Sequence, residues 1–89
     1  MSSTQTSYVE LNILNDRFYL HSIYPVNWSS FISDAIKFNS VEETRSIMNK
    51  RYSQISQSLD DNLQAINSIK IVTLEDGNII GEEYYIRRE

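Results

Sequence analysis

Several residue types that carry chemistry are absent or rare in this chain of 89 residues, which has no cysteine, one histidine, one proline and two glycines. Without cysteine the chain can form neither disulfides nor thiolate metal sites, which excludes a disulfide-stapled secreted scaffold and fits a reducing compartment. Two glycines are too few for a P-loop or a dinucleotide-binding fingerprint, and the single histidine matches no recognised metal-ligand spacing. We therefore expect no catalytic, cofactor-binding or metal-binding residues and no cofactor.

Long apolar runs and an excess of basic charge are also missing. No run approaches the roughly 20 apolar residues of a membrane-spanning helix, and the first residues, MSSTQTS, lack the basic and hydrophobic regions of a signal peptide. We expect a cytoplasmic protein that does not contact membranes. Eight basic residues against twelve acidic ones give a net charge of −4. This charge disfavours direct nucleic-acid binding and favours a basic protein surface as partner.

The chain does contain enough bulky apolar material for one folded domain, with 40% hydrophobic residues that include six tyrosines, three phenylalanines and one tryptophan. A chain of this length buries roughly two-thirds of its unfolded surface, which allows one core and no second domain. Residues 1–7 are small and polar without periodicity, so we expect a flexible N-terminus followed by a single domain over residues 8–89.

Apolar and polar residues alternate along YVELNILNDRFYLHSI, residues 8–23, which predicts a β-hairpin. A two-residue turn at Asn15-Asp16 places Leu11 opposite Leu20, because Asn and Asp tolerate the positive φ of such turns. One face of this hairpin is then apolar and packs under a helix. Its members are Val9, Leu11, Ile13, Phe18 and Leu20.

The same register sets Glu10 opposite His21 on the other face of the hairpin. A Glu–His pair can do general acid–base work when it is partly buried. On an open sheet face it is more commonly a solvated cross-strand contact. We favour the second interpretation and expect no enzymatic activity.

The segment YPVNWSSFISDAIKFNS follows, and its proline stops the preceding strand. Apolar residues then recur at intervals of three and four, which predicts a short helix over residues 28–36. The alternation in AIKFNS keeps open a second interpretation, a short strand through Ile36 and Phe38. The apolar residues of the helical pattern are Trp28, Phe31, Ile32, Ala35 and Ile36.

A capping box, SVEE, predicts a helix start, with the Ser40 hydroxyl accepting from the Glu43 amide. From Val41 to Ile66 apolar residues keep to one helical face at a period close to 3.6. Two layouts fit this stripe. The chain either restarts near SLDD, giving helices over about 41–57 and 59–67, or forms one long helix whose uncovered end pairs with a second copy or a partner.

The last segment, IKIVTLEDGNIIGEEYYIRRE, has β-branched runs on both sides of Asp76-Gly77 and predicts a second hairpin over residues 69–86. A two-residue turn sets Leu74 against Ile79. A three-residue turn gives a cleaner apolar face and is the register we favour, with Gly81 marking a bulge or a close backbone approach. The face of the favoured register carries Val72, Leu74, Ile80, Tyr84 and Ile86.

Together these elements predict an α+β fold: a four-stranded antiparallel sheet built from two β-hairpins, 8–23 and 69–86, with one or two central helices packed on one face. Four acidic doublets, at 42–43, 60–61, 75–76 and 82–83, either imitate the phosphates of a nucleic acid or cap elements and aid solubility. Tyrosine and tryptophan are enriched at interface hot spots. Our candidate partner-binding residues are Tyr8, Glu10, Tyr19, Trp28, Asp60, Asp61, Glu82 and Glu83.

The order of three segments, YVELNILNDRFYLHSI, then AIKFNSVEETRSIM, then IKIVTLEDGNIIGEEYYIRR, is one point of resemblance to known proteins. In this layout, in its size and acidity, and in its scarcity of Gly, Ala and Cys, the chain resembles small accessory proteins of phages and mobile elements. Several of these, anti-CRISPR and anti-restriction proteins among them, block host nucleases by surface contact. The resemblance implies a non-enzymatic inhibitor that binds a nuclease or CRISPR effector in a bacterial cytoplasm. The alternatives are an interaction or homo-oligomerisation module, for instance a homodimer, and thirdly a weak nucleic-acid-binding accessory protein that stacks bases on Tyr8, Tyr19 and Tyr24.

Overall fold

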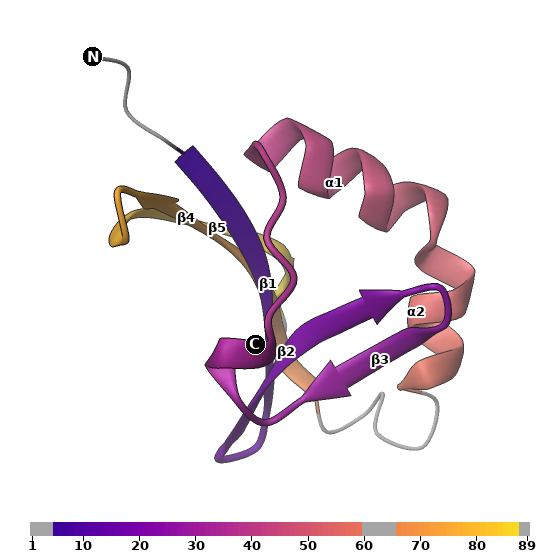
Figure 1. Cartoon of the computed structure of the whole chain (residues 1–89). Coiled ribbons are helices and arrows are strands. Elements are labelled where there is room, and N and C mark those ends of the chain that lie inside the picture. The colour runs from indigo at the N-terminus through magenta and orange to yellow at the C-terminus, as the bar shows by residue number, and fades with distance from the viewer. Residues whose placement is uncertain (1–4, 60–65, 88–89) are drawn as a thin grey trace.

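The computed structural model describes residues 5–59 and 66–87, and Figure 1 shows strands that form one sheet beside two consecutive helices. A short 3-10 turn, η1, follows the third strand. The elements in chain order are β1 (Gln5–Ile13), β2 (Asp16–Ile23), β3 (Val26–Ser29), η1 (Ile32–Asp34), α1 (Val41–Lys50), α2 (Tyr52–Ser58), β4 (Ile66–Glu75) and β5 (Asn78–Arg87).

All five strands lie in one sheet in the order β3-β2-β1-β4-β5, and every neighbouring pair is antiparallel. The two terminal hairpins, β1–β2 and β4–β5, join through β1 and β4. This confirms the predicted α+β class and the single antiparallel sheet. The predicted strand number was too low because the segment after Pro25 forms the edge strand β3. β1 begins at Gln5, three residues before the predicted start of the domain at Tyr8.

Helices α1 and α2 cover one face of the sheet, as Figure 1 shows, and the main core lies between them and the strands. Every residue predicted for the apolar face of the first hairpin contributes to this core. Apolar side chains are completely buried where the helices pack on the central strands, and the hydrophobic effect of this burial is the main contribution to the stability of the fold. The fully buried side chains that join the layers include Val9, Leu11, Met48, Ile69 and Ile71.

The first hairpin turns at Leu14-Asn15, not at the predicted Asn15-Asp16, so Leu11 pairs with Phe18. Leu14 adopts a left-handed φ of 53°, and its carbonyl accepts a 3.0 Å hydrogen bond from the Asn67 side chain. The register therefore differs from the predicted one by two residues. Because side chains alternate with a period of two, this shift leaves each side chain on its predicted face.

The helix predicted over residues 28–36 is wrong. Trp28 lies in β3, which pairs with β2, and its indole N–H donates to the Ser58 hydroxyl at 3.0 Å. Phe31 and Ile32, two members of the supposed helical stripe, are instead 67% and 52% exposed. Strand pairing and the contact with α2 outweigh the helical spacing of the apolar residues.

The alternative strand through Ile36 and Phe38 is confirmed in part. The Ile36 amide donates to the Leu20 carbonyl at 2.9 Å, and Phe38 forms an isolated antiparallel bridge with Ser7. β1 pairs with β2 only from Glu10 onward. The segment therefore fills the space between the two strands where they diverge.

The predicted cap of α1 is confirmed, because the Glu43 amide donates to the Ser40 hydroxyl at 3.0 Å. The helical region breaks at Arg51, whose φ of −106° and ψ of 17° are not helical. The single long helix is therefore wrong, and the restart falls before the predicted SLDD. The second predicted helix is also wrong at its end, since β4 starts at Ile66; residues 60–65 lie outside the described residues.

The second hairpin is confirmed, and its turn is the two-residue Asp76-Gly77 with φ of 52° and 87°. Leu74 faces Ile79, so the favoured three-residue register is wrong. Register shifts opposite Ile69–Lys70 and Thr73–Leu74 place extra residues on β5. These bulges divide the predicted apolar face: Ile86 joins the core under the helices, whereas Val72 and Leu74 belong to a second cluster on the other face.

Candidate functional site

The face of the sheet opposite the helices carries the polar side chains of the strands, and we call it the polar face. One row of aligned residues crosses four strands here, formed by Tyr19, Glu10, Lys70 and Tyr84 of β2, β1, β4 and β5. Two tyrosines thus flank a central acid–base pair. Neighbouring positions on the same face are Tyr8, Asn12, Arg17, Val72 and Glu82.

The charges of this row are paired within the domain. The Glu10 carboxylate, only 7% exposed, lies 3.5 Å from Arg17 Nε and 3.7 Å from Lys70 Nζ. Lys70 Nζ also lies 3.1 Å from Glu82 Oε1. Burial alone lowers the pKa of Lys70, but the hydrogen bond to Glu82 and the charge of Glu10 outweigh it and raise the pKa above its usual value. Lys70 therefore remains an ammonium at neutral pH.

Tyr8 lies on the polar face but is buried there, with 4% exposure, because it packs against Ala35 and Val72. Its ring centroid lies 5.9 Å from that of Tyr19 and 5.3 Å from Lys37 Nζ. Burial, and then the charge of Glu10, raises the pKa of Tyr8. Tyr8 therefore packs beside Tyr19 and Val72 and offers little area to a partner.

The polar face unites four of the eight candidate partner-binding residues: Tyr8, Glu10, Tyr19 and Glu82. The other described candidates lie elsewhere, since half-buried Trp28 contacts α2 and Glu83 forms an ion pair with Arg45 of α1. Asp60 and Asp61 lie outside the described residues. The candidates thus divide between two surfaces.

The three acidic doublets within the described ranges are dispersed. Residues 42–43 lie in the first turn of α1, residues 75–76 at the β4–β5 turn, and Glu82 and Glu83 on opposite faces of β5 with a basic partner each. This distribution favours the capping and solubility interpretation over an imitation of nucleic-acid phosphates.

The expected Glu10–His21 opposition is wrong, because Glu10 faces Tyr19 in the observed register. His21 Nδ1 instead lies 2.8 Å from the carbonyl oxygen of Asp34 in η1. No group of three or more His, Asp or Glu side chains suited to a metal ion occurs in the described part of the chain.

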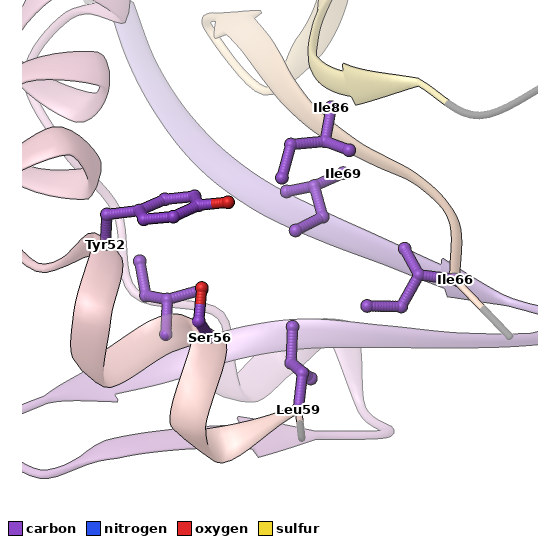
Figure 2. A pocket seen from close by; sticks show the side chains of 7 residues that line it. Tyr52, Ser56, Leu59, Ile66, Ile69 and Ile86 are labelled. Carbon is purple, nitrogen blue, oxygen red and sulfur yellow. The ribbon is translucent and has the colours of Figure 1, made fainter. Parts of the chain in front are cut away.

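A second candidate site, which the sequence did not indicate, is a pocket between α2 and the β4–β5 hairpin, and we call it the α2 pocket (Figure 2). Its volume is about 130 Å³. Figure 2 shows the Tyr52 ring extending from α2 across the pocket toward Ile69 and Ile86, with the Ser56 hydroxyl also directed into it. The lining residues are Tyr52, Ile55, Ser56, Leu59, Ile66, Ile69 and Ile86.

Beside the α2 pocket, β5 is held to the helical layer by Tyr85, whose hydroxyl donates to Asn49 Oδ1 at 2.7 Å. Burial, and then the nearby Tyr52, raises the pKa of Tyr85. The Tyr85 phenol is therefore a neutral hydrogen-bonding group at physiological pH. The chemistry available here is hydrophobic contact and neutral hydrogen bonding.

No family model matches the chain, and no curated protein or solved structure is found to be similar to it. Among the helices of the described ranges, none combines the length and apolarity needed to span a membrane.

Proposed function

We propose that this chain is a non-enzymatic protein-binding domain that inhibits a host defence nuclease of the CRISPR or restriction type in a bacterial cytoplasm. The observation that carries the proposal is the row across the polar face, in which Tyr19 and Tyr84 flank the Glu10–Lys70 pair. Tyrosine is among the side chains that are enriched at protein interfaces and their hot spots.

The paired charges favour contact with a protein surface. Glu10 and Lys70 are held by each other and by their strands, so a partner would immobilise few additional side chains on binding. Tyr84 at one end of the row is 51% exposed, and the Arg17 side chain beside the row is 70% exposed, so both offer contact area to a partner. The net charge of −4 adds long-range attraction to the basic surface with which a nuclease holds its nucleic acid.

The proposal is tested by mixing the purified chain with candidate defence nucleases and measuring complex formation and DNA cleavage. A stable complex with loss of cleavage supports it. The Tyr84→Ala variant is expected to weaken that complex about tenfold or more, as hot-spot tyrosines do. Tyr24→Ala is the matched control, because Tyr24 is 73% exposed at the β2–β3 turn, away from the polar face. Failure to bind or inhibit any such nuclease would count against the proposal.

The other functions predicted from sequence have less support. The apolar stripe that motivated a self-assembling module packs in the domain's own core through Met48, Ile55 and Leu59. Base stacking on Tyr8 is prevented by its burial. Light scattering at high concentration and titration with a fluorescent oligonucleotide test these two alternatives directly.

A further inference from the structure

Strand β5 lies at one edge of the sheet, and no other strand in the described ranges pairs with its outer side. The outward N–H and C=O groups of an edge strand can pair with an additional strand. The bulges on β5 fall at Ile80 and Tyr85 and bracket a regular stretch from Gly81 to Tyr84. The available edge is therefore short, sufficient for a few residues of an extended segment.

The α2 pocket adjoins this edge. Ile86 of β5 forms part of its wall, and Ile55 and Leu59 of α2 face it. A segment that pairs with Gly81–Tyr84 and continues past the bulge at Tyr85 would place a residue beside Ile86, with its Cβ atom about 5 Å from that of Ile86 on the helix-covered face. Its side chain would then reach the pocket.

The size of the pocket matches one large apolar side chain. Its volume of about 130 Å³ is well below the ~300–1,000 Å³ of pockets that hold drug-sized ligands. Cavities of about 150 Å³ lined by aliphatic side chains accept a benzene ring. The Tyr52 and Ser56 hydroxyls have no hydrogen bond to another described residue, so they can bond the main chain of a bound segment.

The carboxylates of the β5 edge indicate which kind of segment this site binds. Glu82 and Glu83 occupy the middle of the regular stretch, one on each face, with side chains 48% and 47% exposed beside their intramolecular partners Lys70 and Arg45. An extended segment beside β5 would meet a carboxylate on both faces, which favours basic residues. A second copy paired antiparallel about the centre of this stretch would bring the two glutamate doublets opposite each other, and like charges opposite each other destabilise strand pairing.

We propose that the β5 edge and the α2 pocket together bind an extended, basic segment of a partner protein. Its main chain pairs with Gly81–Tyr84, and one large apolar side chain occupies the pocket. This inference rests on the proposed function, to which it adds a second contact surface and the chemistry of the bound segment.

The test uses a capped nine-residue peptide, titrated into the full ¹⁵N-labelled chain. Its central phenylalanine is followed outward on each side by valine, arginine, valine and arginine. We expect saturable amide shifts in α2 and β5 with a Kd of about 1 mM or tighter. Replacing the phenylalanine of the peptide with serine is expected to weaken binding about tenfold or more, because the pocket then no longer buries a large apolar side chain.

Variants with matched controls test each part of the site. Ser56→Phe fills the pocket and is expected to weaken peptide binding at least tenfold, whereas Ser53→Phe, the same change at an exposed position of α2, leaves it unchanged. The pair E82Q/E83Q is expected to weaken binding about threefold to tenfold. E42Q/E43Q changes the net charge equally, at the start of α1, and is expected to have no effect.

The inference would be overturned if the peptide caused no saturable amide shift, if the shifts were confined to the polar face, or if the phenylalanine and serine peptides bound equally. It would also be overturned if β5 amide shifts depended on protein concentration without peptide, because that would indicate a second copy at the edge. A nuclease complex that Tyr84→Ala weakens and Ser56→Phe does not would leave the proposed function standing and reject this site. Peptide binding at α2 and β5 without any nuclease inhibition would support the site and count against the proposed target.

Discussion

The Glu10–Lys70 ion pair makes a quantitative prediction, because it joins the two terminal hairpins inside the sheet. Lys70 Nζ lies 3.7 Å from Glu10 Oε2, and the two side chains are 18% and 7% exposed. At an effective dielectric constant of about 20, unit charges at this separation attract by about 4 kcal/mol. Desolvation offsets part of that attraction, which leaves an expected coupling energy of about 1–3 kcal/mol.

The Arg45–Glu83 pair provides the comparison within the same protein. It also joins two distant elements, α1 and β5, but its side chains are 42% and 47% exposed. Exposed pairs are screened by water and salt, so the expected coupling is about 0–1 kcal/mol. The structure therefore predicts a larger coupling energy for the more buried pair on the polar face.

The assay is a double-mutant cycle for each pair, with Glu10→Gln and Lys70→Gln in one and Arg45→Gln and Glu83→Gln in the other. Urea denaturation gives the free energy of unfolding of each single and double variant. Equal coupling energies in the two cycles, or a coupling near zero for Glu10 and Lys70, would refute the reasoning. Raising the salt concentration is expected to reduce the Arg45–Glu83 coupling more strongly.

Three further predictions follow from the core, the helix cap and the buried phenols. Met48→Ala, at 0% exposure, is expected to lower the free energy of unfolding by about 2–5 kcal/mol, whereas Ile80→Ala at an exposed position changes it by less than about 0.5 kcal/mol in the same urea assay. Ser40→Ala is expected to lower it by about 0.5–2 kcal/mol, and Ser40→Asp to restore most of that loss. Tyr8 and Tyr85 have pKa values raised above 10.0 in the folded chain. Their contribution to the free energy of unfolding is therefore fully present below pH 10 and is lost as the pH rises through the folded pKa. Unfolding measured between pH 9 and 11 is therefore expected to show falling stability, with a shallower fall in Tyr85→Phe.

Both terminal hairpins and the start of α1 could be predicted because their signals are local. Alternation with a period of two assigns each side chain to a face, and Asp76-Gly77 and the Ser40 capping box mark a turn and a helix start. The same period leaves pairing registers that differ by two residues equivalent. The choice between them depends on contacts distant in sequence, such as the bond from Asn67 to the Leu14 carbonyl.

The middle of the chain was predicted poorly because tertiary pairing decides its structure. Apolar spacing of three and four residues around Trp28 fits a helix, but β2 offers an edge for strand pairing and Ser58 a partner for the indole. Likewise, nothing in the stripe from Val41 to Ile66 marks the break at Arg51. That break turns α2 so that both helices can cover one sheet.

Half of the row on the polar face was indicated by the sequence, since alternation along the first hairpin placed Tyr19 and Glu10 on its mixed face. The neighbouring Glu82 was indicated by its acidic doublet. Their arrangement was not predictable, because Glu10 meets Lys70 only through the β1–β4 pairing, which joins segments from opposite ends of the chain. The α2 pocket depends on the same joining of distant elements. Sequence patterns describe the faces of single elements and the two strands that a turn joins, but not the residue-by-residue pairing of strands that are distant in the chain.

The β1–β4 pairing is thus the claim on which the single sheet and the row across its polar face depend, because it brings Glu10 opposite Lys70. Nuclear Overhauser effects between backbone protons of the free chain measure it directly. We predict cross-strand effects between Val9 and Ile71 and between Tyr8 and Val72. A spectrum that connects β1 only with β2, and β4 only with β5, would contradict the account.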